Sequence, residues 1–234
     1  MSKVTLKLDL VSAKGCETRA VAILHAVIAG WTGRNQAAME KHIAELEAIG
    51  VPRPASTPIF YRVAATRLTT ANEIQVMGQD SSGEVEFVLT NIGGRLWVGV
   101  GSDHTDRVVE TIGITLSKHM CEKPMAFTLF PHDEVADHWD RLTLRSYIRE
   151  GDELVLYQEG PVTTMLDPLD LIERYGKSAG LAEGTLMFCG TLPAKGGIRP
   201  SDRFEFELSD PVLGRTIRHA YNIACLPVAE KADG

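Results

Sequence analysis

Two glutamates, Glu84 and Glu86, lie in the run Gly-Glu-Val-Glu-Phe-Val-Leu at residues 83–89. On a strand, side chains two residues apart point to the same face and lie roughly 6–7 Å apart. Because an apolar run follows, the pair would sit beside a core, where burial and like charge both disfavour two ionised carboxylates. A bound cation would relieve that cost. The alternative is a solvent-facing edge strand with two ordinary surface glutamates.

A third acid, Asp103, follows the apolar run at 96–101. Side chains at the point where a strand leaves the core are often functional. Asp103 would complete a set of carboxylate oxygens of the kind that Mg²⁺ prefers, with room for waters that a substrate could displace. The alternative is that Ser102 or Asp103 is the N-cap of a following helix.

His42 and Glu45 form a His-x-x-Glu pair on a helix predicted at 35–49. Residues at i and i+3 share a helix face, so the carboxylate could orient the imidazole as a base. The alternative is a half-buried histidine beside a surface glutamate. The acidic, His-containing segment 131–140 is interpreted as a polar turn rather than a metal site, and Cys189 as a buried strand thiol.

Charge and hydropathy exclude several classes of protein. The chain has 24 Lys and Arg against 31 Asp and Glu, a net charge of −7, and no basic stripe that would neutralise the phosphates of duplex nucleic acid. The longest apolar run, at 20–29, is too short for a membrane span, and the N-terminus lacks a signal peptide. Four scattered cysteines without a CxxC pair favour a reducing cytoplasm.

These side chains must be positioned by a chain of 234 residues, 44% of them apolar, which suits a single domain over 1–234. We expect N-terminal strands and a helix in 1–57 and a β-rich body in 58–234. Short apolar runs between turn residues predict strands. The predicted strands are 4–11, 19–30, 59–63, 73–77, 84–90, 96–101, 140–148, 153–158, 185–189, 203–208 and 215–226. With helices at 107–119 and 168–175, the fold class is α+β with strands dominating.

The segment 184–208 carries a resemblance to a known family. A strand runs into Gly190-Thr191-Leu192-Pro193, and a glycine loop, a Pro200-Ser201-Asp202 turn and a strand of alternating Phe and Glu follow. This order resembles the C-terminal signature of the fumarylacetoacetate hydrolase superfamily. The chain departs from it by one inserted residue before Pro193 and by a serine in place of the usual glycine at 201. It is similar to a bacterial branch of the superfamily that is known as a domain of unknown function.

The resemblance implies a β-rich mixed-sheet roll with a few short helices and a homodimer. It also implies that the Glu-x-Glu strand and the aspartate after the next strand hold Mg²⁺ or Mn²⁺, which here are Glu84, Glu86 and Asp103. Further site residues are implied at positions that match the family's motifs. They are Arg62 and Thr191 for substrate binding, Lys123 or else Lys118 as the active-site lysine, and a water-activating dyad of His42 and Glu45.

The function implied is that of a hydrolase or lyase acting on a small keto acid of the acylpyruvate or oxaloacetate type. Its shared step is an enolate that a divalent metal stabilises. Hydration, dehydration and tautomerisation follow from the same step, so the fold does not choose among them. The alternative from another functional class is a non-catalytic member of the superfamily that binds a small acid.

Overall fold

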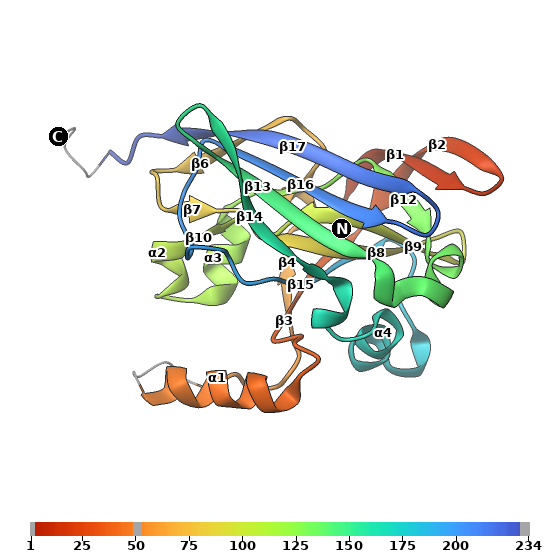
Figure 1. Ribbon diagram of the computed structural model, residues 1–234, viewed down its shortest axis with the longest axis horizontal. Coiled ribbons are helices and arrows are strands. Elements are labelled where there is room, and N and C mark those ends of the chain that lie inside the picture. The colour runs from red at the N-terminus through yellow and green to blue at the C-terminus, as the bar shows by residue number, and fades with distance from the viewer. Residues whose placement is uncertain (1–2, 49–52, 230–234) are drawn as a thin grey trace.

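The computed structural model describes residues 3–48 and 53–229, apart from the side chains of His42, Glu45 and Leu46. Two sheets pack face to face (Figure 1). In sheet order, the larger consists of β2 (Gly15–Ile23), β1 (Val4–Ser12), β12 (Thr128–Pro131), β9 (Arg95–Ser102), β8 (Val85–Ile92), β15 (Thr185–Thr191), β3 (His25–Gly30) and β4 (Ile59–Val63). The smaller consists of β14 (Glu153–Pro161), β13 (Thr143–Glu150), β16 (Arg203–Asp210), β17 (Arg215–Leu226) and β6 (Glu73–Met77).

Short elements complete the chain. Two-stranded ladders join β7 (Ser81–Ser82) to β10 (Thr105–Asp106) and β5 (Leu68–Thr69) to β11 (Lys123–Pro124). The α-helices are α1 (Gln36–Ala48), α2 (Arg107–Glu110), α3 (Ile114–Met120) and α4 (Pro168–Gly176). The 3-10 helices are η1 (Ala65–Arg67), η2 (His132–Glu134), η3 (Ala136–Arg141, kinked at His138), η4 (Val162–Thr164) and η5 (Lys177–Ala179). No described helix has the length and apolar content that crossing a membrane requires.

Alternation along the central strands builds two cores, one on each face of the large sheet. Phe87 and Leu89 of β8 belong to the core between the two sheets, together with Phe204 of β16. Val88 belongs to the second core, on the opposite face, with Phe188 of β15 and the leucines of β1. Successive side chains of a strand point to opposite faces, so a central strand buried on both sides reads as a continuous apolar run.

Most predicted elements are confirmed, and the α+β class with strands dominating is confirmed as well. The single strand predicted at 19–30 is wrong, because the chain breaks at Leu24 into β2, which pairs with β1, and β3, which pairs with β15 and β4. The helix predicted at 107–119 is interrupted before Gly113, which has an extended backbone at φ −177° and starts α3.

The β8–β9 hairpin brings the acidic segments together. Its register places Glu86 opposite Gly101, and Val85 opposite Ser102, so Asp103 follows directly at the end of β9. A side chain at Gly101 would meet the ring of Phe188 at 2.6 Å, and one at Gly99 would meet Leu129 at 2.4 Å. Both glycines therefore give space to apolar side chains of neighbouring strands.

Candidate metal centre

The carboxylates of Glu84, Glu86 and Asp103 converge on one point at the end of the β8–β9 hairpin. One oxygen from each lies within 4.8 Å of the others, and in the described part of the chain this is the only such group of three His, Cys, Asp or Glu side chains. Glu86 and Asp103 are buried and Glu84 is half-buried. The alternative of two ordinary surface glutamates on an edge strand is therefore wrong, since β8 lies inside the large sheet.

Two lysines neutralise part of this negative charge. The ammonium of Lys118, on α3, contacts Asp103 Oδ2 and lies 3.6 Å from Glu84 Oε2. Lys123 Nζ lies 2.9 Å from Asp103 Oδ1. Burial alone would raise the pKa of Asp103, but Lys118 and Lys123 outweigh burial and lower that pKa to about 2. Burial likewise works against charged Lys118, yet Asp103 and Glu84 raise its pKa above the usual value, so the lysine and aspartate stay charged together.

Glu86 differs from the other two acids in its partners. It is 2% exposed, and Gly190 N–H donates to its Oε2 at 2.7 Å. Among the described residues, no basic side chain forms a hydrogen bond or ion pair with Glu86. Burial raises its pKa well above the usual glutamate value, and the charge of Asp103 raises it further. A buried carboxylate that lacks a cationic partner favours a bound cation or proton.

A bulge in β15 supplies the Gly190 amide. The pairing of β15 with β8 shifts register between Phe188 and Thr191, and Gly190 has φ +98°, which favours glycine. A Cβ on Gly190 would approach Thr32 Oγ1 at 1.8 Å. Thr191 then donates its hydroxyl to the carbonyl of Val85 at 2.8 Å.

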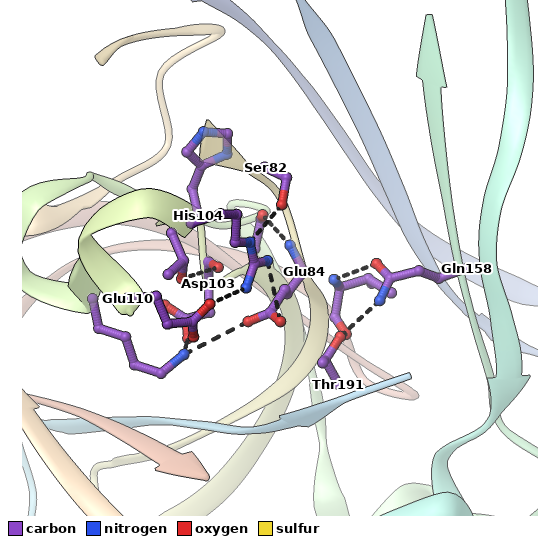
Figure 2. A network of polar contacts seen from close by, with 12 residues as sticks. Ser82, Glu84, Asp103, His104, Glu110, Gln158 and Thr191 are labelled. Carbon is purple, nitrogen blue, oxygen red and sulfur yellow. Dashed lines mark hydrogen bonds and ion pairs between the residues drawn. The ribbon is translucent and has the colours of Figure 1, made fainter. Parts of the chain in front are cut away.

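Gln158 of β14 ties this bulge to the hairpin from the second sheet (Figure 2). Its amide nitrogen donates to Thr191 Oγ1 at 2.9 Å and to the carbonyl of Leu192. Its oxygen accepts from Val85 N–H and Ser146 Oγ, each at 2.9 Å. Since Gln158 is 2% exposed, these contacts satisfy a buried amide and fix the position of Thr191.

Arg107, at the start of α2, holds Glu84 from the other side. Its Nη2 lies 3.2 Å from Glu84 Oε1, its Nη1 donates to Glu110 Oε2 at 3.0 Å, and its Nε donates to Ser82 at 2.7 Å (Figure 2). The acid cluster is thus bordered by three basic side chains. A substrate carboxylate could bind near them without facing an uncompensated negative field.

His104 directly follows Asp103 in the chain and is fully buried. Its Nδ1 pairs with Tyr221 OH at 2.8 Å and its Nε2 with Ser81 Oγ at 2.9 Å. Burial lowers the pKa of His104 to about 3, with help from the positive charges of Lys123 and Arg107. The imidazole therefore stays neutral and joins the segment between β9 and β10 to Ser81 of β7 and Tyr221 of β17.

The remaining predicted site residues are placed as follows. His42 and Glu45 fall on α1, and their side chains lie outside the described residues. Arg62 is on β4, where its guanidinium contacts His25 Nδ1 at 2.7 Å and Tyr175 OH at 3.3 Å rather than the acid cluster. Both candidates for the active-site lysine, Lys118 and Lys123, contact Asp103, so both belong to the acid cluster.

Two other interpretations can be compared with the structure. The N-cap of α2 is Asp106, whose side chain accepts from Val109 N–H at 2.9 Å, so Ser102 and Asp103 are not helix caps. Cys189 is a buried strand thiol, as predicted, and burial raises its pKa.

Arg107 and Gln158 belong to the site but were not predicted from the sequence as site residues. Arg107 follows Asp103 by four residues, but nothing in its local sequence distinguishes it from a surface arginine.

The chemistry of this donor set fits a hard divalent cation. The three carboxylates offer only oxygen, which suits Mg²⁺ or Mn²⁺ better than zinc, for which nitrogen and sulfur ligands dominate. Glu86, which is buried and has no basic hydrogen-bond or ion-pair partner in the described part of the chain, is the acid whose charge a dication would balance.

Comparisons with known proteins identify a family and a fold. A family model described as a protein of unknown function (DUF2848) matches residues 29–221. No curated protein matches the sequence significantly. Among solved structures, Cg1458 with inhibitor is similar at a TM-score of 0.66 and 16% identity, covering 91% of this chain and 81% of that one.

Two further solved structures share the fold. Yeast ynq8, a fumarylacetoacetate hydrolase family protein, has a TM-score of 0.62 at 17% identity, covering 91% of this chain and 97% of that one. The 2-keto-3-deoxy-D-arabinonate dehydratase complexed with magnesium and 2,5-dioxopentanoate has a TM-score of 0.65 at 13% identity, covering 90% and 77%. At these identities the likeness shows the fold, which is the mixed-sheet roll that the sequence predicts.

Proposed function

Because this chain belongs to the DUF2848 family and has the fold of fumarylacetoacetate hydrolase family proteins, we propose that it is a divalent-metal-dependent hydrolase or lyase of a small keto acid. The observation that carries the proposal is the environment of Glu86. Its carboxylate is buried, has no basic partner among the described residues, and lies with Glu84 and Asp103 around one point. The magnesium and 2,5-dioxopentanoate in the dehydratase complex support the choice of metal and of a keto compound.

Mg²⁺ or Mn²⁺ would be held by Glu84, Glu86 and Asp103. When bound, such a dication supplies Lewis-acid stabilisation for negative charge that develops on a keto oxygen. The protein's own groups prepare the ligands: Gly190 N–H orients Glu86, and Lys118 with Lys123 keeps Asp103 ionised.

The roles of the lysines differ in this proposal. Lys123 is fully buried, so it acts through Asp103. The Lys118 side chain keeps 9% exposure and lies between Glu84 and Asp103, so its ammonium can also meet a substrate oxygen. Thr191, held by Gln158, and Arg62 would bind the substrate carboxylate, and His42 oriented by Glu45 would activate water or move a proton.

The acylpyruvate and oxaloacetate types fit best, because an α-keto carboxylate offers two adjacent oxygens to one site. A hydratase or dehydratase is the second candidate, and the dehydratase with the same fold favours it. We further propose a cytoplasmic homodimer.

The first experiment is thermal melting with Mg²⁺ or Mn²⁺, with and without oxalate as an enolpyruvate mimic. A ligand that binds only the folded state raises stability by RT ln(1 + [L]/Kd), which is about 2.7 kcal/mol at a hundredfold excess over Kd. We expect a metal-dependent rise in melting temperature that oxalate enlarges. Glu86→Gln should abolish it, and Glu205→Gln, an acid on β16 that pairs with Arg203, should not.

No metal-dependent shift in the wild-type protein would refute the metal site. The second experiment is a screen of keto acids with Mg²⁺ that follows loss of the enol or ketone absorbance. Binding of oxalate without turnover of any keto acid would favour the non-catalytic acid-binding member over the enzyme.

A further inference from the structure

The strand β2 forms an unprotected edge of the large sheet. It is the first strand in the sheet order, and in the described part of the chain it pairs only with β1. The ladder between them runs from Ser12↔Gly15 to Val4↔Ile23 without a register shift. The first six residues of β2, 15–20, are exposed, and the hairpin projects from the body of the molecule (Figure 1).

The other three sheet edges are protected in ways that β2 is not. The edge strands β4 and β6 have five residues each. The edge strand β14 has nine residues, but its ladder with β13 shifts register at Ser146/Tyr147 and it ends in Pro161. Short length, bulges, proline and charged side chains are the usual means of blocking edge-to-edge pairing. β2 has nine residues, no bulge and no proline. Its two charged residues, Glu17 and Arg19, have opposite signs, so they block pairing only with a strand that does not match them.

The hairpin geometry decides which backbone groups are available. Ser12 and Gly15 flank a two-residue turn, so they form a hydrogen-bonded pair, and such pairs alternate along an antiparallel ladder. Gly15, Glu17 and Arg19 therefore direct their N–H and C=O groups toward β1. Cys16, Thr18 and Ala20 direct theirs outward.

We propose that β2 pairs antiparallel with β2 of a second copy of this chain, around a two-fold axis at Thr18. In this register Thr18 faces Thr18 of the second copy, Cys16 faces Ala20, and their outward backbone groups hydrogen bond in pairs. Glu17 then lies opposite Arg19 of the second copy, twice by symmetry. Within one copy these two side chains already pair at 2.9 Å, so the interface joins two ion pairs into one alternating cluster.

Charge selects this register over its neighbours. A residue whose backbone groups point outward can pair only with another such residue. The register between the two β2 strands can therefore change only in steps of two residues. Moving the axis to residue 17 places Glu17 opposite Glu17, and moving it to residue 19 places Arg19 opposite Arg19. Like charges directly opposite each other destabilise a ladder, whereas opposite charges stabilise it. The occupant that matches β2 is therefore β2 itself.

The first test is a disulfide cross-link with Ala20→Cys in a Cys225→Ser background, which removes the other exposed thiol. Paired residues at hydrogen-bonded positions have Cα atoms about 5.5 Å apart, within the range that a disulfide spans. Mild oxidation should give a dimer through Cys16 and the new cysteine. Adding Cys16→Ser should abolish it. Ala22→Cys is the matched control, because residue 22 is outward and exposed but does not face Cys16 in this register.

The second test exchanges charges and measures dimer dissociation by analytical ultracentrifugation. Glu17→Arg or Arg19→Glu alone should weaken the dimer at least about tenfold, since each creates two like-charge contacts. The double variant Glu17→Arg/Arg19→Glu should restore the wild-type dissociation constant. Unchanged melting of the monomer would show that each variant folds.

Three results would overturn the proposal. The first is a wild-type protein that stays monomeric at about 100 μM, roughly the top of the usual range for a weak dimer. The second is a dimer that both single variants leave intact. The third is cross-linking through Ala22→Cys in place of Ala20→Cys. None of the changed residues belongs to the acid cluster, so the metal-dependent melting shift of the preceding subsection is unaffected by the outcome.

Discussion

The amide of Gly190 and the carboxylate of Glu86 are joined across adjacent strands by a hydrogen bond of 2.7 Å. The bond exists because a bulge turns Gly190 out of the regular β15–β8 ladder. A bulge residue of β15 thus fixes the direction of the one acid in the cluster that has no basic partner among the described residues.

Gly190→Ala should damage this arrangement. The added Cβ meets Thr32 Oγ1 at 1.8 Å, and φ +98° is strained for alanine, which together should cost about 2–3 kcal/mol of unfolding free energy. We expect a lower denaturation midpoint and weaker metal binding by calorimetry. Thr32→Ala removes the clash but not the strain, so the double variant should recover only part of the stability. A stable Gly190→Ala protein with unchanged metal affinity would contradict this account.

Lys123→Met should destabilise the protein more than Lys118→Met. Lys123 is 0% exposed, and removing it leaves Asp103 with one fewer buried partner, which typically costs about 3–5 kcal/mol. Lys118→Met should cost less, because its side chain keeps 9% exposure whereas that of Lys123 keeps none. Urea unfolding of both variants measures the difference. Asp103→Asn in the Lys123→Met background should regain stability, and a further loss instead would count against a buried pair.

Gln158→Leu should release Thr191. The change removes the Gln158 partner of the Val85 N–H and of the Leu192 carbonyl, and each unsatisfied buried group costs about 1–3 kcal/mol. Thr191 loses the hydrogen bond from the Gln158 amide and keeps only its own bond to the Val85 carbonyl. If Thr191 binds substrate, KM for a keto acid should rise severalfold while metal affinity changes little. Steady-state kinetics and calorimetry separate the two effects. Ser146→Ala is the matched control, because it removes one bond to Gln158 but keeps both contacts to Val85 and Thr191.

Asp210 should contribute stability that depends on pH. Burial alone would raise its pKa, but hydrogen bonds from Leu213 N–H, His138 and Arg215 outweigh burial and lower the pKa below the usual aspartate value. A carboxyl whose pKa is depressed by folding stabilises the protein above its unfolded pKa of about 3.9 and loses that contribution as pH falls through the folded value.

The measurement compares wild type with Asp210→Asn by urea unfolding between pH 7 and pH 3. The stability difference should be about 2 kcal/mol at pH 7 and shrink below pH 4. A difference that is constant over this range would show that the carboxylate charge is not what stabilises the β16–β17 turn.

The acid cluster could be anticipated from sequence because it rests on local order. A Glu-x-Glu strand, a tight turn and a second strand fix the register, and that register carries Asp103 to Glu84 and Glu86. The same reasoning fails for Gln158, because its partners are 12 to 73 residues away and depend on how the two sheets pack. It fails for 19–30 as well, since one polar residue in an apolar run, His25, does not show that the chain breaks at Leu24 and that the two halves pair with different strands.

Gly99 and Gly101 have one more consequence. Since β9 has no side chains at these positions, the space beside them is filled by Leu129 and Phe188, which belong to β12 and β15 and pack against the hairpin that carries the carboxylates. A peptide limited to the β8–β9 hairpin would contain all three acids and still lack a binding site. Metal affinity should therefore arise late, only when distant parts of the chain have assembled.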